Sequence, residues 1–320
     1  MQTKTPEISR APVVNSVATL LRSLIDYAGL FPPASLAMTA AVENYRAYSR
    51  SAENWILGRF IVPVARLGEF ERTFEAKYLE LPFRSTGPEQ DATWPLSALL
   101  GGDVAADLDQ IREFNDRLAA SSSPVDVSIQ SVEVKVGNPK EVESLAKIIP
   151  PEFETYFEIP LNTSVSDCIV AVAHCGRRAK IRTGGETADK FPAPGSVIEF
   201  MRLCAELNVP FKATAGLHHP LRSVHRFTYE PSSPSGMMHG FLNVFLAAAF
   251  LRAGMETEVV LQLLREESAS AFHFDSEGAI WRDHRLSLRN IAAARERFAI
   301  SFGSCSFIEP VDDLRTLHLL

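Results

Sequence analysis

Short apolar segments and longer amphipathic segments alternate along most of the chain, and this alternation limits the folds open to it. The apolar segments have the length of buried strands, and most end at glycine, proline or asparagine. Strands that alternate with helices build parallel sheets, because each helix returns the chain to the start of the next strand. The eight predicted strands lie at residues 24–30, 58–64, 94–100, 131–136, 155–159, 179–183, 210–214 and 299–304.

Helical patterns fill most of the intervals between these strands. Asp103 stands where an N-cap is expected, and Asn138 and Pro139 open another helix with proline at its first position. Eight strands with helices between them in 320 residues favour an α/β fold, a closed (β/α)8 barrel of the TIM type, over two open sheets. The first strand is followed by no glycine-rich dinucleotide fingerprint. The predicted helices lie at residues 67–79, 104–119, 139–148, 165–174, 196–207, 240–253 and 311–319.

Two segments exceed a minimal barrel. Residues 1–20 are predicted to be an N-terminal extension, so the single barrel domain would span residues 21–320. Residues 254–298 form an insertion before the last strand, with helical patterns at 256–267 and 287–297. Barrel enzymes often place a lid or a subunit contact at such a position. The insertion is therefore a candidate lid or the contact surface of a homo-oligomer.

The composition of the chain indicates which cellular environment and which classes of partner to expect. The net charge of -7, without a basic patch, argues against nucleic acid as a partner. The four cysteines form no C-x-x-C pair and have no metal-binding spacing, which is typical of reduced thiols in a cytoplasmic protein. The longest uncharged stretch, residues 231–251, contains proline, serine and histidine, and its apolar part is too short to cross a membrane. We expect a buried helix there.

Two consecutive predicted strands each carry one lysine followed by small residues and glycine. Lys180 precedes Arg182 and a Gly-Gly turn, and Lys212 precedes Thr214 and Gly216. A helical segment lies between the strands, so both lysines should reach the same end of a parallel sheet. Lysine is scarce in this chain, with eight residues against twenty-four arginines. Its presence within strands indicates a chemical role for an amine.

Three neighbouring cations, Lys180, Arg182 and Lys212, would depress the pKa of at least one amine, because like charges disfavour protonation. A neutral lysine can attack a carbonyl carbon and form a Schiff base. The same cations could instead bind an anion as fixed charges, or serve structure alone. The pattern therefore leaves three interpretations open.

The segment Lys180-Ile181-Arg182-Thr183-Gly184 resembles the K-x-x-T-G motif of deoxyribose-phosphate aldolases and their class I relatives. Lys212 with the small residues up to Gly216 resembles the lysine on their next strand. The resemblance covers residues 179–218 and implies that Lys180 forms the imine while Lys212 lowers its pKa. It departs from the family pattern where Arg182 replaces a small residue and Ala215 replaces a glycine, which puts a sugar phosphate of the usual shape in doubt.

Other polar residues follow the predicted strands. Glu158 ends the fifth strand, beside the strand of Lys180, and is a candidate general acid or base. His218 and His219 follow the seventh strand, where one histidine could act as a proton shuttle or, with Glu158, as a metal ligand. Asp26 lies in an apolar strand and needs a partner such as Lys180 or Lys212.

The leading prediction is a carbon–carbon lyase of the class I aldolase type that acts on a small anionic carbonyl compound without cofactor or metal. The alternatives are a metal-assisted lyase or hydrolase and a non-catalytic barrel that binds an anionic metabolite. Glycine turns at strand ends offer free N–H groups to an anion. The predicted catalytic residues are Lys180, Lys212, Glu158 and His218. The predicted substrate-binding residues are Arg182, Thr183, Gly184, Gly185, Thr214, Gly216, His219, Asp26, Gly303 and Ser304.

Overall fold

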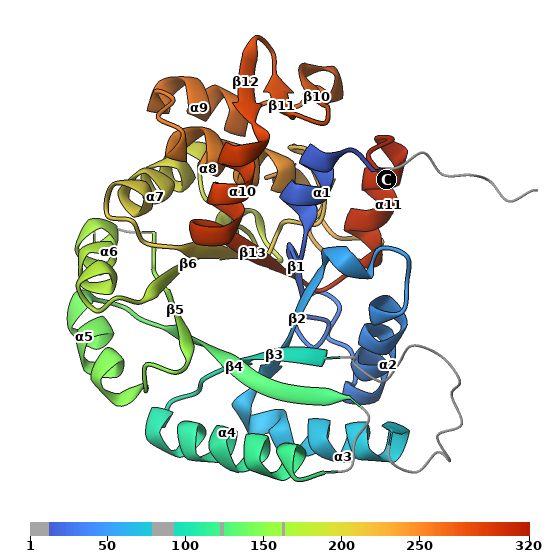
Figure 1. The fold of residues 1–320 in the computed structure, drawn as a ribbon, viewed down its shortest axis with the longest axis vertical. Coiled ribbons are helices and arrows are strands. Elements are labelled where there is room, and N and C mark those ends of the chain that lie inside the picture. Colours follow the sequence, from blue (N-terminus) through green and yellow to red (C-terminus); the bar gives the residue numbers. More distant parts are fainter. Residues whose placement is uncertain (1–12, 79–92, 122–124, 162–163) are drawn as a thin grey trace, which may run out of the picture.

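A computed structural model describes residues 13–78, 93–121, 125–161 and 164–320. Its centre is a closed barrel of eight parallel strands (Figure 1), which confirms the predicted (β/α)8 fold of the TIM type. All eight predicted strands are present. They are β1 (Ile25–Tyr27), β2 (Leu57–Pro63), β3 (Thr93–Leu99), β4 (Asp126–Lys135), β5 (Glu154–Glu158), β6 (Arg178–Arg182), β7 (Phe211–Thr214) and β13 (Ala299–Ser304).

Helices surround the barrel on the outside (Figure 1), and their apolar faces pack against the strands. The predicted caps are present, since the Asp103 side chain accepts from the N–H of Ala106 and that of Asn138 from Glu141. The helices are α1 (Asn15–Leu21), α2 (Met38–Ser49), α3 (Leu67–Tyr78), α4 (Val104–Ala119), α5 (Pro139–Ile148), α6 (Val165–His174), α7 (Pro194–Glu206), α8 (Phe241–Arg252), α9 (Thr257–Leu264), α10 (Leu288–Arg297) and α11 (Ile308–Thr316). Short 3-10 turns lie at Asn54–Ile56, Val64–Arg66, Ala188–Lys190 and Ala269–Ala271. The predicted helix at 67–79 ends at residue 79, which lies outside the described residues.

The insertion before β13 contains a small sheet that the sequence analysis did not predict. Strands β10 (Phe272–Phe274), β11 (Gly278–Trp281) and β12 (His284–Ser287) pair antiparallel between α9 and α10. In Figure 1 this sheet and α9 lie on the outer side of α8 and α10. Helix α8 is therefore covered on all sides, and each residue from Phe241 to Phe250 is buried. This confirms the buried helix expected within residues 231–251.

Four further elements were not predicted. The strands β8 (Ser223–Arg226) and β9 (Ser235–Met238) form an antiparallel hairpin between β7 and α8, and α2 follows β1. Helix α1 begins at Asn15, within the predicted N-terminal extension, and buries Val17 and Leu20 against the fold. Residues 1–12 of that extension lie outside the described residues.

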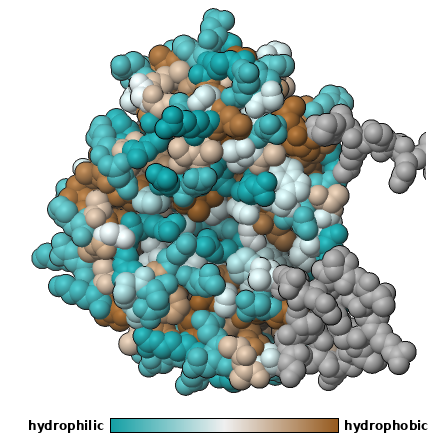
Figure 2. All heavy atoms as spheres, viewed as in Figure 1, coloured by the Kyte–Doolittle hydropathy of each residue, from teal (hydrophilic) through white to brown (hydrophobic). Residues whose placement is uncertain are grey.

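Among the described residues, no helix is both long enough and apolar enough to cross a bilayer. Hydrophilic side chains cover much of the face in Figure 2, with hydrophobic side chains in smaller groups between them. The four cysteines are all free thiols, as predicted.

Candidate active site

The register of the barrel strands brings the predicted acid and the two lysines side by side. Lys180 on β6 is paired with Glu158 on β5 and with Lys212 on β7. Arg182 lies two residues beyond Lys180, on the same face of β6 and about 6.6 Å nearer the carboxyl end of the barrel. The polar side chains of β5, β6 and β7 therefore meet within the barrel, where TIM-type enzymes hold their active sites.

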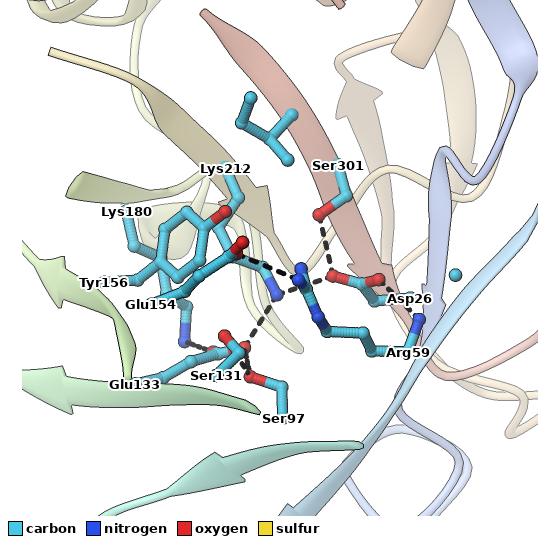
Figure 3. A network of polar contacts seen from close by, with 12 residues as sticks. Asp26, Arg59, Ser97, Ser131, Glu133, Glu154, Tyr156, Lys180, Lys212 and Ser301 are labelled. Carbon is cyan, nitrogen blue, oxygen red and sulfur yellow. Dashed lines mark hydrogen bonds and ion pairs between the residues drawn. The ribbon is translucent and has the colours of Figure 1, made fainter. Parts of the chain in front are cut away.

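Glu133 on β4 lies at the centre of this group and joins both lysines (Figure 3). Its Oε2 lies 2.7 Å from Nζ of Lys180, and its Oε1 lies 2.6 Å from Nζ of Lys212. The hydroxyl of Ser97 donates to the same Oε1 at 2.9 Å. Burial alone would raise the pKa of Glu133, but Lys180 and Lys212 outweigh burial and hold this pKa well below its usual range. Glu133 is thus an anion between two ammonium groups.

Lys212 is fixed from two sides. Its Nζ donates to Oδ2 of Asp26 at 2.6 Å, as well as to Glu133, and Ser301 donates to the same Asp26 oxygen at 2.7 Å. Burial alone would lower the pKa of Lys212, but Asp26 and Glu133 outweigh burial and raise this pKa above its ordinary value. Lys212 is therefore a cation, and the expected depression of an amine pKa does not occur at this lysine. Asp26 has the lysine partner that its burial required.

Lys180 also lies between two carboxylates, Glu133 and Glu158. Its Nζ lies 2.8 Å from Oε2 of Glu158, as an ion pair without the geometry of a hydrogen bond. Arg182 donates from Nε to the other oxygen of Glu158 at 3.2 Å. Burial alone would raise the pKa of Glu158, but Lys180 and then Arg182 outweigh burial and lower it. Glu158 is therefore ionised and within direct proton-transfer distance of the Lys180 amine.

A cavity of about 640 Å³ opens above this group, and Lys180, Glu133 and Glu158 are among its walls. Phe227 and Met238, from the β8–β9 hairpin, also line it. No described residue of the 254–298 insertion does, so the hairpin, rather than the predicted lid, borders the cavity. Nine predicted site residues line this space: Lys180, Lys212, Glu158, Arg182, Gly185, Thr214, Gly216, His218 and Gly303.

Five predicted site residues do not line the cavity, and most of them have a structural contact instead. Asp26 lies behind Lys212, and Thr183 donates from its hydroxyl to the carbonyl of Ala215 at 2.7 Å. Gly184 packs so closely against Gly216 that an added Cβ would lie 2.7 Å from the Gly216 Cα. The remaining two are Ser304, whose hydroxyl accepts from Ser306 N–H, and His219.

The two adjacent histidines point to different partners on α11. His218 contacts Oε2 of Glu309 through Nδ1 at 3.1 Å, and His219 contacts Oδ2 of Asp313 through Nδ1 at 2.6 Å. His218 lines the cavity, whereas His219 stacks on the ring of His225 with centroids 3.3 Å apart. Within the described residues, no group of three or more His, Cys, Asp or Glu side chains has the arrangement of a metal site. The set of Glu158, His218 and His219 is therefore not assembled as ligands.

Glu133 was missed as a site residue, although a signal was present. It shares a strand face with Lys135, and both line the cavity. Strand alternation could place the Glu133 side chain inside the barrel. Its contact with two lysines from β6 and β7 depends on the stagger of the closed barrel, which periodicity does not specify.

Comparison with known protein families and with curated proteins identified no relative of this chain. No model of a known protein family matches the chain, and no curated protein matches it significantly. The function of the site therefore has to follow from its own geometry.

Proposed function

We propose that the protein is a carbon–carbon lyase of the class I aldolase type, in which Lys180 forms a Schiff base with a small anionic carbonyl compound. The observation that carries this proposal is the environment of the Lys180 amine. It borders the cavity, lies within 2.8 Å of the Glu158 carboxylate and has a second cation, Lys212, bound to the same Glu133. We also expect a cytoplasmic protein that binds no nucleic acid, with the 254–298 insertion as a candidate contact surface of a homo-oligomer.

The carboxylates supply a route for the protons of imine formation. Glu158 accepts one proton from the Lys180 ammonium, and the neutral amine then adds to the carbonyl carbon. The resulting carbinolamine loses its hydroxyl as water when Glu158 returns a proton. Lys212 stays charged and holds Glu133 beside Lys180 through its own ion pair with that carboxylate.

The iminium then accepts the electron pair of the carbon–carbon bond that breaks. A base removes the proton of the substrate hydroxyl on the β-carbon, so this carbon leaves as an aldehyde and an enamine remains on Lys180. We assign the base to His218, which lines the same cavity and is oriented through Nδ1 by Glu309. Protonation of the enamine and hydrolysis of the imine by water release the second product.

Reductive trapping tests this proposal. The protein is incubated with aldehydes, ketones and 2-oxo acids, reduced with borohydride and analysed by peptide mass spectrometry. We expect an adduct on Lys180 that is absent from Lys180→Arg and retained by Lys140→Arg, which alters an exposed lysine of α5 that does not line the cavity. An adduct on Lys212 instead would overturn the assignment of the amine. No adduct across the panel, together with binding that survives in Lys180→Arg, would make the protein a metabolite-binding barrel.

A further inference from the structure

More basic than acidic side chains line the cavity, although the protein is acidic. The chain has a net charge of -7, yet five lysine or arginine side chains line the cavity against three glutamates. Lys180 and Lys212 are neutralised at the base of the cavity by Glu133, Glu158 and Asp26. The excess of positive charge therefore belongs to the other three cations, which lie further out.

Two of these cations have unused hydrogen-bond donors. Lys135 is exposed at the end of β4, and its side chain has no hydrogen bond or ion pair within the described part of the chain. Arg182 contacts Glu158 only through Nε, so its two Nη groups are without a contact among the described residues. The third cation, Lys190, pairs at 3.1 Å with Asp189 and is less available.

Their positions define one side of the cavity. Lys135 is paired in register with Glu158, and Arg182 contacts that same glutamate from β6. Lys135 and Arg182 thus flank the strand end of β5. A second cavity of about 390 Å³ begins here, and Lys135, Glu158, Arg182 and Lys190 line both spaces. A ligand bound at Lys180 has room to extend between these cations toward the second cavity.

We propose that Lys135 and Arg182, with Lys190 at the outer edge, form a subsite for an oxyanion at the far end of an elongated carbonyl substrate. This inference rests on the proposed imine at Lys180 and names the class of substrate: a carbonyl compound with a carboxylate or phosphate remote from the reacting carbon. The two Nη groups of Arg182 suit two oxygens of such a group, and Lys135 adds a second charge. Two acidic residues of the 184–190 loop lie nearby: Glu186 lines the first cavity, and Asp189 lines the second, where it is paired with Lys190.

Matched aldehydes test the subsite. Glutaric semialdehyde and pentanal have the same number of carbons and differ in the terminal carboxylate. Glyceraldehyde 3-phosphate and glyceraldehyde form the corresponding pair for phosphate. The rate of reductive trapping at Lys180 is measured for each compound with the wild type, Lys135→Gln, and the double variant Lys135→Gln/Arg182→Gln. Lys140→Gln, an exposed lysine of α5 that lines neither cavity, is the control.

We expect the wild type and Lys140→Gln to trap the anionic member of at least one pair about tenfold faster than its neutral partner. The pair with the larger preference identifies carboxylate or phosphate. In the double variant this preference should fall to about one. An unchanged preference in the double variant, or none in the wild type, would overturn the subsite while leaving the imine mechanism intact.

Absence of any adduct at Lys180 would instead refute the proposed function. The subsite would then be tested by calorimetry with glutarate and inorganic phosphate. Binding of either anion to the wild type that is lost in the double variant would support the subsite, and equal binding or no binding in both proteins would overturn it.

Discussion

Glu133 is held between two ammonium groups in the interior of the barrel, and both charges depend on it. Its side chain is 2% exposed, and the side chains of its partners Lys180 and Lys212 are 4% and 1% exposed. A buried ion pair contributes little when complete, since desolvation offsets attraction. Removing one member, however, leaves the remaining charges buried and uncompensated. Glu133 is therefore the residue whose loss the site tolerates least.

Substitution of Glu133 tests this electrostatic role through stability. We expect Glu133→Gln to lower the free energy of unfolding by about 3–5 kcal/mol at neutral pH, because two buried ammonium groups lose a shared anion. Urea denaturation followed by circular dichroism measures the change. Glu143→Gln, on the exposed side of α5, is the control and should change stability by less than about 0.5 kcal/mol. A similarly small loss in Glu133→Gln would mean that the lysines are not both charged in the folded protein.

Single residues differed in how far the sequence could predict them. The alternation of strand residues placed Lys180, Arg182 and Glu158 on inward faces, and all three line the cavity. Thr183 and Gly184 were assigned to an anion cradle because glycine turns often bind anions. In the structure, the Thr183 hydroxyl donates to the chain after β7, and Gly184 packs against Gly216. Such close packing between loops depends on tertiary contacts, which a local motif does not report.

At the level of elements, helix α11 contributes two carboxylates one turn apart. Glu309 and Asp313 are four residues apart on α11, so they lie on one face of the helix and reach His218 and His219 respectively. Burial would raise the pKa of Glu309, but His218 outweighs burial and lowers it. The two pairs are chemically alike, and only His218 lines the large cavity. Variants of Glu309 and Asp313 can therefore be compared to test the role of His218.

The matched variants are Glu309→Gln and Asp313→Asn. If His218 is the base of carbon–carbon cleavage, Glu309→Gln should lower kcat by about 100-fold, because the imidazole loses the group that orients it. It should also shift the pH–rate profile, while imine trapping at Lys180 persists. Asp313→Asn should leave kcat within about threefold of the wild type. Equal effects of the two variants on kcat, with no shift of the profile, would assign Glu309 a structural role.

Most of the elements that the sequence did not predict are short, and helix α2 is the exception. The eight barrel strands were predicted because each is an apolar run followed by a helix. The strands of the hairpin and of the insertion have three or four residues each, too few to show alternation. Helix α2 did carry a signal, since Met38, Ala41, Val42 and Tyr45 are buried at helical spacing. That spacing was overlooked.

At the scale of the whole molecule, the site is built from strands at both ends of the chain. Asp26 on β1 and Ser301 on β13 are 275 residues apart and share a hydrogen bond, and Lys212 contacts Asp26 from β7. Closure of the barrel and formation of the ion network are thus one event. Loss of these charges at low pH should therefore lower the free energy of unfolding of the entire protein.

Acid should destabilise the folded protein partly through Glu133. Its pKa is lower in the folded state than in the unfolded chain, where the pKa of a glutamate is about 4.3. Its contribution is therefore fully present above that pH and is lost as the pH falls toward the folded-state value. We expect the free energy of unfolding to decrease steadily below about pH 4.5, and to decrease less steeply in Glu133→Gln, which has no carboxyl group to protonate.

Urea unfolding at several pH values between about 3 and 7 measures this dependence. Glu143→Gln again serves as the control and should follow the wild-type curve. The difference between the wild type and Glu133→Gln should be largest near neutral pH and should narrow as acid protonates Glu133 in the unfolded chain. A constant difference at all pH values would show that Glu133 keeps the same proton affinity in both states, and that the two lysines do not stabilise its charge.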